Sequence, residues 1–236
     1  MKTTGNNRSG AVIGGCFALL LLVSPIISRS EQQKDDNNTT SLTEPKVMEK
    51  ENAIKTDTAT FAAGCFWCVE EQFKQLKGVE SVTSGYTGGT VPDPTYKEVG
   101  TGTTGHAEAC NIVFDPAKIS YEQLMEAFFV AHDPTQLNRQ GNDVGTQYRS
   151  AIFYHNAKQQ KLATYYIKRL NEEKAYEKNI VTQVMPYGMF YKAEDYHQDY
   201  YANNSDAPYC QLVIKPKLEK FKKVFKHELK YRKDTR

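Results

Sequence analysis

The sequence has little that would indicate a metalloprotein or a nucleic-acid binder. Its five histidines are scattered singly, and no second C-x-x-C pair accompanies the one formed by Cys65 and Cys68. A structural zinc site usually needs four ligands in paired spacing, so the sequence argues against one. The formal net charge of the 236 residues is only +2, which does not indicate a protein that binds nucleic acid.

Positive charge collects only at the C-terminus. Residues 215–236 contain ten Lys or Arg against three Asp or Glu. Leu218, Phe221, Phe225 and Leu229 fall at the spacing of one helix face. The segment therefore predicts a basic amphipathic helix with a solvated outer face, and we expect no nucleic-acid partner.

Long uncharged apolar runs are absent except near the N-terminus. Residues 11–27 form such a run after two basic residues, and Ser28 and Ser30 offer small residues for cleavage. The run has 17 residues, between the lengths typical of an export signal and of a membrane span. Residues 1–30 therefore predict a signal peptide, with an uncleaved membrane anchor as the alternative. We expect an exported protein, in a periplasmic or other extracytoplasmic space, that contacts a membrane only through this segment.

Aliphatic side chains are nearly missing from residues 31–57. The segment is rich in Gln, Asn, Asp, Glu, Lys and Thr. Such a composition buries too little apolar surface to offset the entropy of ordering the chain. We expect a disordered polar linker here, followed by a folded domain over residues 58–214.

Cysteine is scarce, and its distribution leaves two interpretations open. Cys16 lies in the predicted export segment, so the folded domain keeps Cys65, Cys68, Cys110 and Cys210. Four cysteines in an exported domain are compatible with two structural disulfides, as in a binding domain without enzymatic activity. They are equally compatible with a domain that uses some of its thiols for chemistry.

The order of predicted elements indicates an α+β fold. Strands and amphipathic helices follow one another as β-α-β-β-α-β between residues 58 and 154. This is the order of the ferredoxin-like split βαβ sandwich, in which helices cover one face of a sheet. Residues 90–105 and 133–146 predict long loops, which in a compact domain are usually functional. The predicted strands are 58–62, 79–86, 107–114, 148–154 and 181–185, and the predicted helices are 66–77, 121–131, 157–173 and 194–202.

Gly64-Cys65-Phe66-Trp67-Cys68 has the character of a reactive thiol site. A strand is expected to end here and a helix to begin, so Cys65 falls at a helix N-terminus, where free amides and the helix dipole favour a thiolate. A thioredoxin-like dithiol would have Trp before its first cysteine, whereas Trp67, the only tryptophan, stands between Cys65 and Cys68. A thiol–disulfide oxidoreductase that uses these two cysteines stays open as an alternative.

Glu108 opens a predicted strand directly after a loop rich in Gly and Thr. An acid at such a junction can be partly desolvated, which raises its pKa and allows it to donate a proton near neutral pH. A solvent-facing carboxylate is the alternative. Tyr96, Asp143 and Tyr148 also lie on or beside long loops, but none of them indicates a site when taken alone.

Seven motifs occur in order along the folded domain: GCFWCVE (64–70), GYTGG (85–89), PTYKEV (94–99), TGHAEA (104–109), SYEQL (120–124), HDPTQLNRQGNDVGTQYRSAI (132–152) and YKAEDYHQDY (191–200). In this order and spacing the chain resembles the peptide methionine sulfoxide reductase A family over about residues 58–210. The resemblance implies an enzyme that repairs oxidative damage by reducing methionine S-sulfoxide, free or within proteins. It also implies that no metal and no organic cofactor takes part.

Reduction of a sulfoxide needs a thiolate for the sulfur and hydrogen-bond donors for the oxygen. Carried over by the resemblance, Cys65 is the nucleophile that becomes a sulfenic acid, and Glu108 gives a proton to the sulfoxide oxygen. The resemblance also implies that Tyr96 and Tyr148 donate hydrogen bonds to this oxygen and that Asp143 belongs to the same polar set, acting through water. In the same way, Phe66 and Trp67 form the apolar wall that receives the S-methyl group.

The sulfenic acid then condenses with a resolving thiol, and thioredoxin or a similar dithiol reduces the resulting disulfide. Pro208-Tyr209-Cys210 fits the C-terminal resolving position of the family, although the glycine-rich tail often seen after that cysteine is missing. Cys210 is therefore the first candidate, and Cys68, one helical turn from Cys65, is the alternative. We expect the side chain of Cys110 to be buried as a small apolar group. We expect the protein to act as a monomer.

Overall fold

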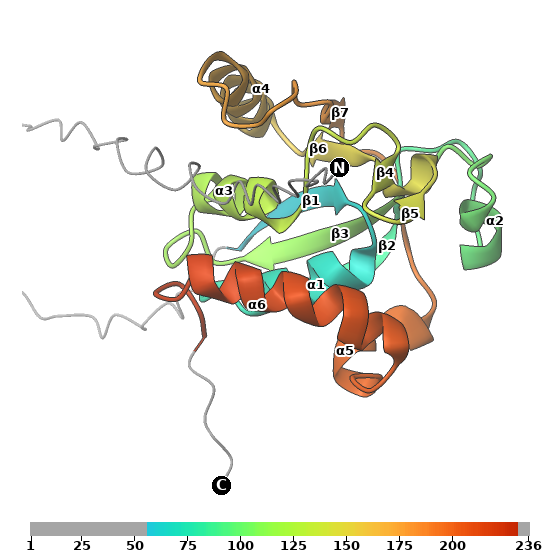
Figure 1. Cartoon of the computed structure of the whole chain (residues 1–236). Coiled ribbons are helices and arrows are strands. Elements are labelled where there is room, and N and C mark those ends of the chain that lie inside the picture. The colour runs from blue at the N-terminus through green and yellow to red at the C-terminus, as the bar shows by residue number, and fades with distance from the viewer. Residues whose placement is uncertain (1–55, 231–236) are drawn as a thin grey trace, which may run out of the picture. The chain divides into compact units, whose positions relative to one another are not determined.

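The computed structural model describes residues 56–230 (Figure 1). The predicted export segment, residues 1–30, and nearly all of the predicted linker lie outside the described residues. The last residue of that linker prediction is wrong, because Asp57 already belongs to the first strand. Within residues 56–230, no helix is both long and apolar enough to cross a membrane.

A mixed six-stranded sheet forms the centre of the domain, with the strand order β7-β6-β1-β3-β2-β8. All neighbouring strands are antiparallel except β6 and β7, which are parallel. Two very short strands, β4 and β5, pair in a separate hairpin. The strands are β1 (Asp57–Ala63), β2 (Val79–Thr87), β3 (Ala107–Phe114), β4 (Arg139–Gln140), β5 (Asp143–Val144), β6 (Ser150–Tyr154), β7 (Gln183–Pro186) and β8 (Phe190–Lys192).

Helices α1, α3 and α6 lie along one side of the sheet, and α5 lies beside α1 (Figure 1). Short helical turns connect the longer elements around the site described below. The helices are α1 (Phe66–Lys74), α2 (Tyr96–Gly100), α3 (Tyr121–Ala131), α4 (Ala157–Glu172), α5 (Tyr200–Asn203) and α6 (Lys215–Val224), with 3-10 turns η1 (Thr146–Tyr148) and η2 (Asp195–His197) and a π-helical turn η3 (Cys210–Ile214).

Aromatic rings join the sheet to these helices. The Phe61 ring of β1 lies 5.7 Å from Phe73 of α1 and 5.0 Å from Phe128 of α3, measured between ring centroids. Phe221 of α6 lies 6.2 Å from Phe73, and all four side chains are at most 1% exposed. Rings at these separations attract one another beyond the burial of their area. Helix α6 therefore contributes its apolar face to the same core.

The structure corrects several predicted boundaries. The helix predicted over 66–77 ends at Lys74, and the basic helix predicted over 215–236 ends at Val224. The loop predicted over 90–105 contains α2, which a capping box starts: Thr95 accepts from the backbone N–H of Glu98, and the Glu98 carboxylate accepts from Thr95. The Thr-x-x-Glu signal for this helix was present in the sequence.

The helix predicted over 194–202 is interrupted. Asp199 adopts φ +54, so the chain forms η2 before it and α5 after it. The backbone N–H of Asp199 donates to Glu70 of α1 at 3.0 Å, and its carboxylate forms an ion pair with Lys74. Contacts with α1 therefore hold this turn in place. The mixed sheet and its helices confirm the α+β class, and the ferredoxin-like description stays a prediction.

Candidate active site

A sharp turn at the end of β1 places Cys65 at the start of α1. Gly64 has φ +84, and a Cβ atom at this position would lie 2.6 Å from Cβ of Gln140, so glycine alone fits without strain. The carbonyl of Cys65, the N-cap residue, accepts the backbone N–H groups of Cys68 and Val69 at 3.1 and 3.4 Å. The predicted place of Cys65 at a helix N-terminus is confirmed.

Glu108 reaches the same helix N-terminus from β3. Its Oε2 atom accepts the backbone N–H of Phe66 at 3.0 Å, and the residue is 2% exposed. Burial, followed by the charge of Cys65, raises the pKa of the Glu108 carboxyl well above its usual value, although the hydrogen bond from Phe66 acts in the opposite direction. The solvent-facing alternative is therefore wrong, and Glu108 is suited to hold a proton near neutral pH.

Burial also decides the protonation state of Cys65, which is 5% exposed. Burial raises the pKa of its thiol well above the usual value, and the adjacent Cys68 adds to the rise. A hydrogen bond with the Tyr209 hydroxyl and one from the Trp67 backbone lower the pKa of Cys65 but are outweighed. Burial therefore opposes the helix N-terminus at Cys65 and favours the neutral thiol in the resting site.

Three cysteines from distant segments lie in one buried cluster. Cys65 and Cys68 of α1 share it with Cys210 of η3, which is 0% exposed. The fourth, Cys110 of β3, is also 0% exposed and contacts the Phe66 carbonyl oxygen at 3.6 Å, as its predicted structural role requires. All four are free thiols. The interpretation as two structural disulfides therefore finds no support in this structure.

Tyr96 of α2 and Tyr148 of η1, the predicted donors to the sulfoxide oxygen, converge on the same place. Burial, and after it the charge of Glu108, raises the pKa of both phenols. Both also sense the charges of Cys65 and Asp143. A raised phenol pKa keeps the O–H proton in place, so both side chains can donate hydrogen bonds over the whole physiological pH range.

Asp143 of β5 is connected to Cys65 through a residue that sequence reasoning did not assign. The hydroxyl of Tyr209 donates to Asp143 Oδ2 at 2.7 Å and also hydrogen-bonds to Cys65. Tyr209 therefore lies between the thiol and the carboxylate. Its only signal in the sequence was its position directly before the candidate resolving cysteine.

The two predicted wall residues, Phe66 and Trp67, lie in an aromatic cluster. The Trp67 ring stacks on Tyr200 of α5 with centroids 3.7 Å apart and planes 8° apart. Its Nε1–H donates to Nδ1 of His197 at 3.2 Å. Tyr200 and His197 were not singled out from the sequence, although both lie in the motif YKAEDYHQDY. In this structure the aromatic wall is covered by the chain's own C-terminal segment.

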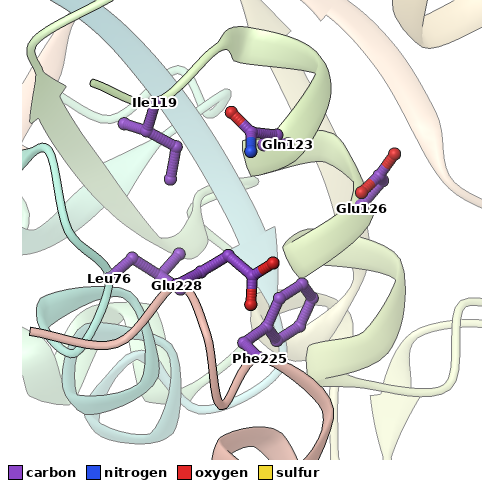
Figure 2. A pocket seen from close by; sticks show the side chains of 6 residues that line it. All are labelled: Leu76, Ile119, Gln123, Glu126, Phe225 and Glu228. Atoms are coloured by element: carbon purple, nitrogen blue, oxygen red, sulfur yellow. The ribbon is translucent and has the colours of Figure 1, made fainter.

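A small pocket beside α3 is separate from the cysteine cluster, because no cysteine lines it (Figure 2). Within residues 56–230, no group of three or more His, Cys, Asp or Glu is arranged to hold a metal ion. The pocket is lined by Leu76, Ile119, Gln123, Glu126, Phe225 and Glu228.

The site therefore brings together a buried thiol, a buried carboxyl group, two phenols and an aromatic cluster. This set is suited to attack on a polarised sulfur whose oxygen must be protonated, which defines a thiol-dependent oxidoreductase.

The comparisons with known proteins agree. Residues 57–229 match the family described as peptide methionine sulfoxide reductase. The chain belongs to the peptide methionine sulfoxide reductase family.

The matched region covers almost the whole length of two related proteins. The peptide methionine sulfoxide reductase MsrA of Saccharolobus solfataricus is 54% identical over 174 residues, covering 74% of this chain and 97% of that protein. The MsrA of Pasteurella multocida is 55% identical over 170 residues, with 72% and 97% covered.

Solved structures agree in fold. Methionine sulfoxide reductase A of Corynebacterium diphtheriae superimposes with a TM-score of 0.58 at 37% identity, covering 64% of this chain and 76% of that chain. Reduced Mxr1 of Saccharomyces cerevisiae gives a TM-score of 0.62 at 32% identity, covering 70% and 94%.

The burial of Cys65 predicts an unreactive thiol in the absence of substrate. We expect iodoacetamide to modify Cys65 of the reduced protein more slowly than free cysteine at pH 7, because burial raises the thiol pKa and restricts access. The modification rate of each cysteine can be followed by peptide mass spectrometry. The denatured chain is the control, in which all thiols react alike. A Cys65 that reacts faster than free cysteine at pH 7 would contradict this description.

Proposed function

We propose that this chain reduces the S epimer of methionine sulfoxide, free or within proteins, with Cys65 as nucleophile and Glu108 as proton donor. The observation that carries the proposal is the hydrogen bond from the Phe66 backbone to Glu108, which holds a buried acid beside Cys65. Family membership supports the reaction itself. The two phenols and the aromatic wall provide separate places for the oxygen and the methyl group, which is what selection of one epimer requires.

In the first step the Cys65 sulfur attacks the sulfoxide, and Glu108 gives its proton to the oxygen. The thiol proton of Cys65 leaves as the sulfur attacks, and the carboxylate just formed on Glu108 is the buried base able to receive it. The oxygen then passes to Cys65, so the products are methionine and a Cys65 sulfenic acid. Sulfoxide sulfur is reduced by two electrons and cysteine sulfur is oxidised by two. Tyr96 and Tyr148 stabilise the charge that develops on the oxygen.

The sulfenic acid is cleared by a second thiol, with formation of a disulfide and release of water. Cys210 is our first candidate because it lies in the same buried cluster as Cys65 and begins a π-helical turn. Such turns are rare and occur mostly at functional sites. Cys68 is the alternative, since its hydrogen bond with Cys65 lowers the Cys68 pKa. An external dithiol, thioredoxin or a similar protein, then reduces the disulfide by thiol exchange.

The interpretations of the sequence that concern export, oligomeric state, repair and fold type are kept as proposals. Residues 1–30 export the protein, as a cleaved signal or as a membrane anchor, and the enzyme acts there as a monomer in repair of oxidised proteins. The ferredoxin-like description is proposed for the four strands in the order β6-β1-β3-β2, whose antiparallel pairing supports it.

Replacement of the acid tests the proposed proton donor. We expect Glu108→Gln to lower kcat by about 10²- to 10⁴-fold, because the amide can still accept the Phe66 N–H but has no acidic proton to give. Turnover of a methionine-S-sulfoxide peptide by the reduced enzyme is the measurement. Glu80→Gln, at an exposed carboxylate of β2, is the matched control and should behave as wild type. Unchanged turnover by Glu108→Gln would overturn the role of Glu108 as proton donor, whereas disulfide exchange without any sulfoxide reduction by wild type would favour the Cys65/Cys68 thiol–disulfide oxidoreductase.

Disulfide mapping tests the resolving thiol. After one equivalent of substrate and without reductant, we expect wild type to contain a Cys65–Cys210 disulfide, because these residues share one cluster. With thioredoxin as the reductant, Cys210→Ser should form one equivalent of methionine and then stop. Under the same conditions Cys110→Ser should turn over as wild type does. Mass spectrometry of unreduced peptides distinguishes the pairings. A Cys65–Cys68 disulfide in wild type would transfer the resolving role to Cys68.

A further inference from the structure

His197 holds the edge of the only tryptophan in the chain. The indole Nε1–H of Trp67 donates to Nδ1 of His197 at 3.2 Å, across 130 residues of sequence. Indole nitrogen is a donor only, so the acceptor must offer a lone pair. Trp67 comes from α1 and His197 from η2, so this hydrogen bond ties the C-terminal segment to the helix that begins after Cys65.

The imidazole of His197 also contacts two other residues assigned to the substrate, Phe66 and Tyr96. Its ring centroid lies 5.3 Å from that of Phe66 and 4.3 Å from that of Tyr96. The residue is 1% exposed. A single buried ring therefore touches both residues of the proposed methyl wall and one of the proposed oxygen donors.

The hydrogen bond fixes the protonation state of this ring. Because Nδ1 accepts from Trp67, the proton of the neutral imidazole lies on Nε2. A second proton could only bind at Nδ1, where it would face the indole N–H. Protonation of His197 and its hydrogen bond with Trp67 therefore exclude one another.

Few ionisable groups surround the ring. Nε2 is buried without a hydrogen-bond partner in the described part of the chain, and the Glu194 carboxylate lies 3.9 Å away. That carboxylate already accepts the Tyr86 hydroxyl at 2.8 Å and the Tyr96 backbone N–H at 2.9 Å. The other ionisable side chains packed on the ring are two phenols, Tyr96 from α2 and Tyr196 from η2. Burial lowers the pKa of His197, and the opposing effect of Glu194 is smaller.

We propose that neutral His197 is a positioning residue that fixes the indole plane of Trp67 and thereby sets the apolar wall for the S-methyl group. The inference rests on the proposed function, in which Trp67 receives that group. A hydrogen bond at the edge of the indole leaves its faces available, one of which now stacks on Tyr200. Protonation of His197 removes the acceptor and releases the indole from this orientation.

The expected effect is on substrate binding rather than on the chemical step. A neutral hydrogen bond of this kind corresponds to a change of roughly threefold to tenfold in an equilibrium constant. We expect His197→Leu, which keeps bulk but has no acceptor, to raise KM for a methionine-S-sulfoxide peptide by about this factor with kcat nearly unchanged. His197→Gln offers an amide oxygen to the indole and should restore KM to within about twofold of wild type.

Intrinsic fluorescence gives a readout that needs no activity, because Trp67 is the only tryptophan in 236 residues. We expect wild-type emission to change as the pH falls and His197 becomes protonated, and KM to rise over the same range. Neither His197→Gln nor His197→Leu should show this transition. His227→Gln, at an exposed histidine after α6, is the control and should titrate as wild type.

The outcomes are separable. A KM unchanged in His197→Leu, a loss confined to kcat, or a pH-dependent emission that survives in both His197 variants would each overturn the positioning role. So would a failure of His197→Gln to restore KM. If wild type itself reduces no sulfoxide, the proposed function fails, whereas the emission of Trp67, recorded also in Cys65→Ser, still shows whether His197 holds the indole.

Discussion

The hydrogen bond from the Phe66 backbone to Glu108 joins the two segments on which the chemistry depends. One segment is the turn from β1 into α1, where Gly64 allows the chain to place Cys65 at the helix start. The other is the beginning of β3, which follows a long loop and carries Glu108 on its inner face. At 3.0 Å and away from solvent, this bond keeps the acid beside the nucleophile without using the acid's own proton.

Burial gives the site its second property. The same exclusion of water raises the pKa of both Cys65 and Glu108, and so favours the protonated form of both groups. The proposed reaction then needs no net change of charge, because in it Glu108 gives a proton to the sulfoxide oxygen and takes up the proton that the Cys65 thiol loses. Trp67 packs against Tyr200 and Tyr209 from the C-terminal segment, and Cys210 shares one buried cluster with Cys65.

Local sequence signals predicted those parts of the site that local rules determine. The strand end and the helix start expected around Gly64 and Cys65 are those observed, and Cys110 is buried as expected. The capping box that starts α2 could have been read in the same way. Tertiary contacts determine the rest. The thiol state of Cys65 follows from burial by a segment more than a hundred residues away, which no local pattern reports.

The same limit applies to the residues that sequence reasoning did not assign. Tyr209 acquires its role only where the chain returns to Asp143, and His197 only where it meets Trp67. The turn at Asp199, which interrupts a predicted helix, depends on Glu70 and Lys74 of α1. Segments without a recognisable local sequence signal thus become part of the site, because the C-terminal chain folds back against α1.

Single-turnover reduction tests the central claim most directly. The pre-reduced domain is mixed with one equivalent of a peptide that contains either the S or the R epimer of methionine sulfoxide, and methionine is quantified without any external reductant. The account predicts one equivalent of methionine from the S epimer, none from the R epimer, and none from either epimer with Cys65→Ser. Methionine formed by Cys65→Ser, or none formed by wild type from the S epimer, would contradict it.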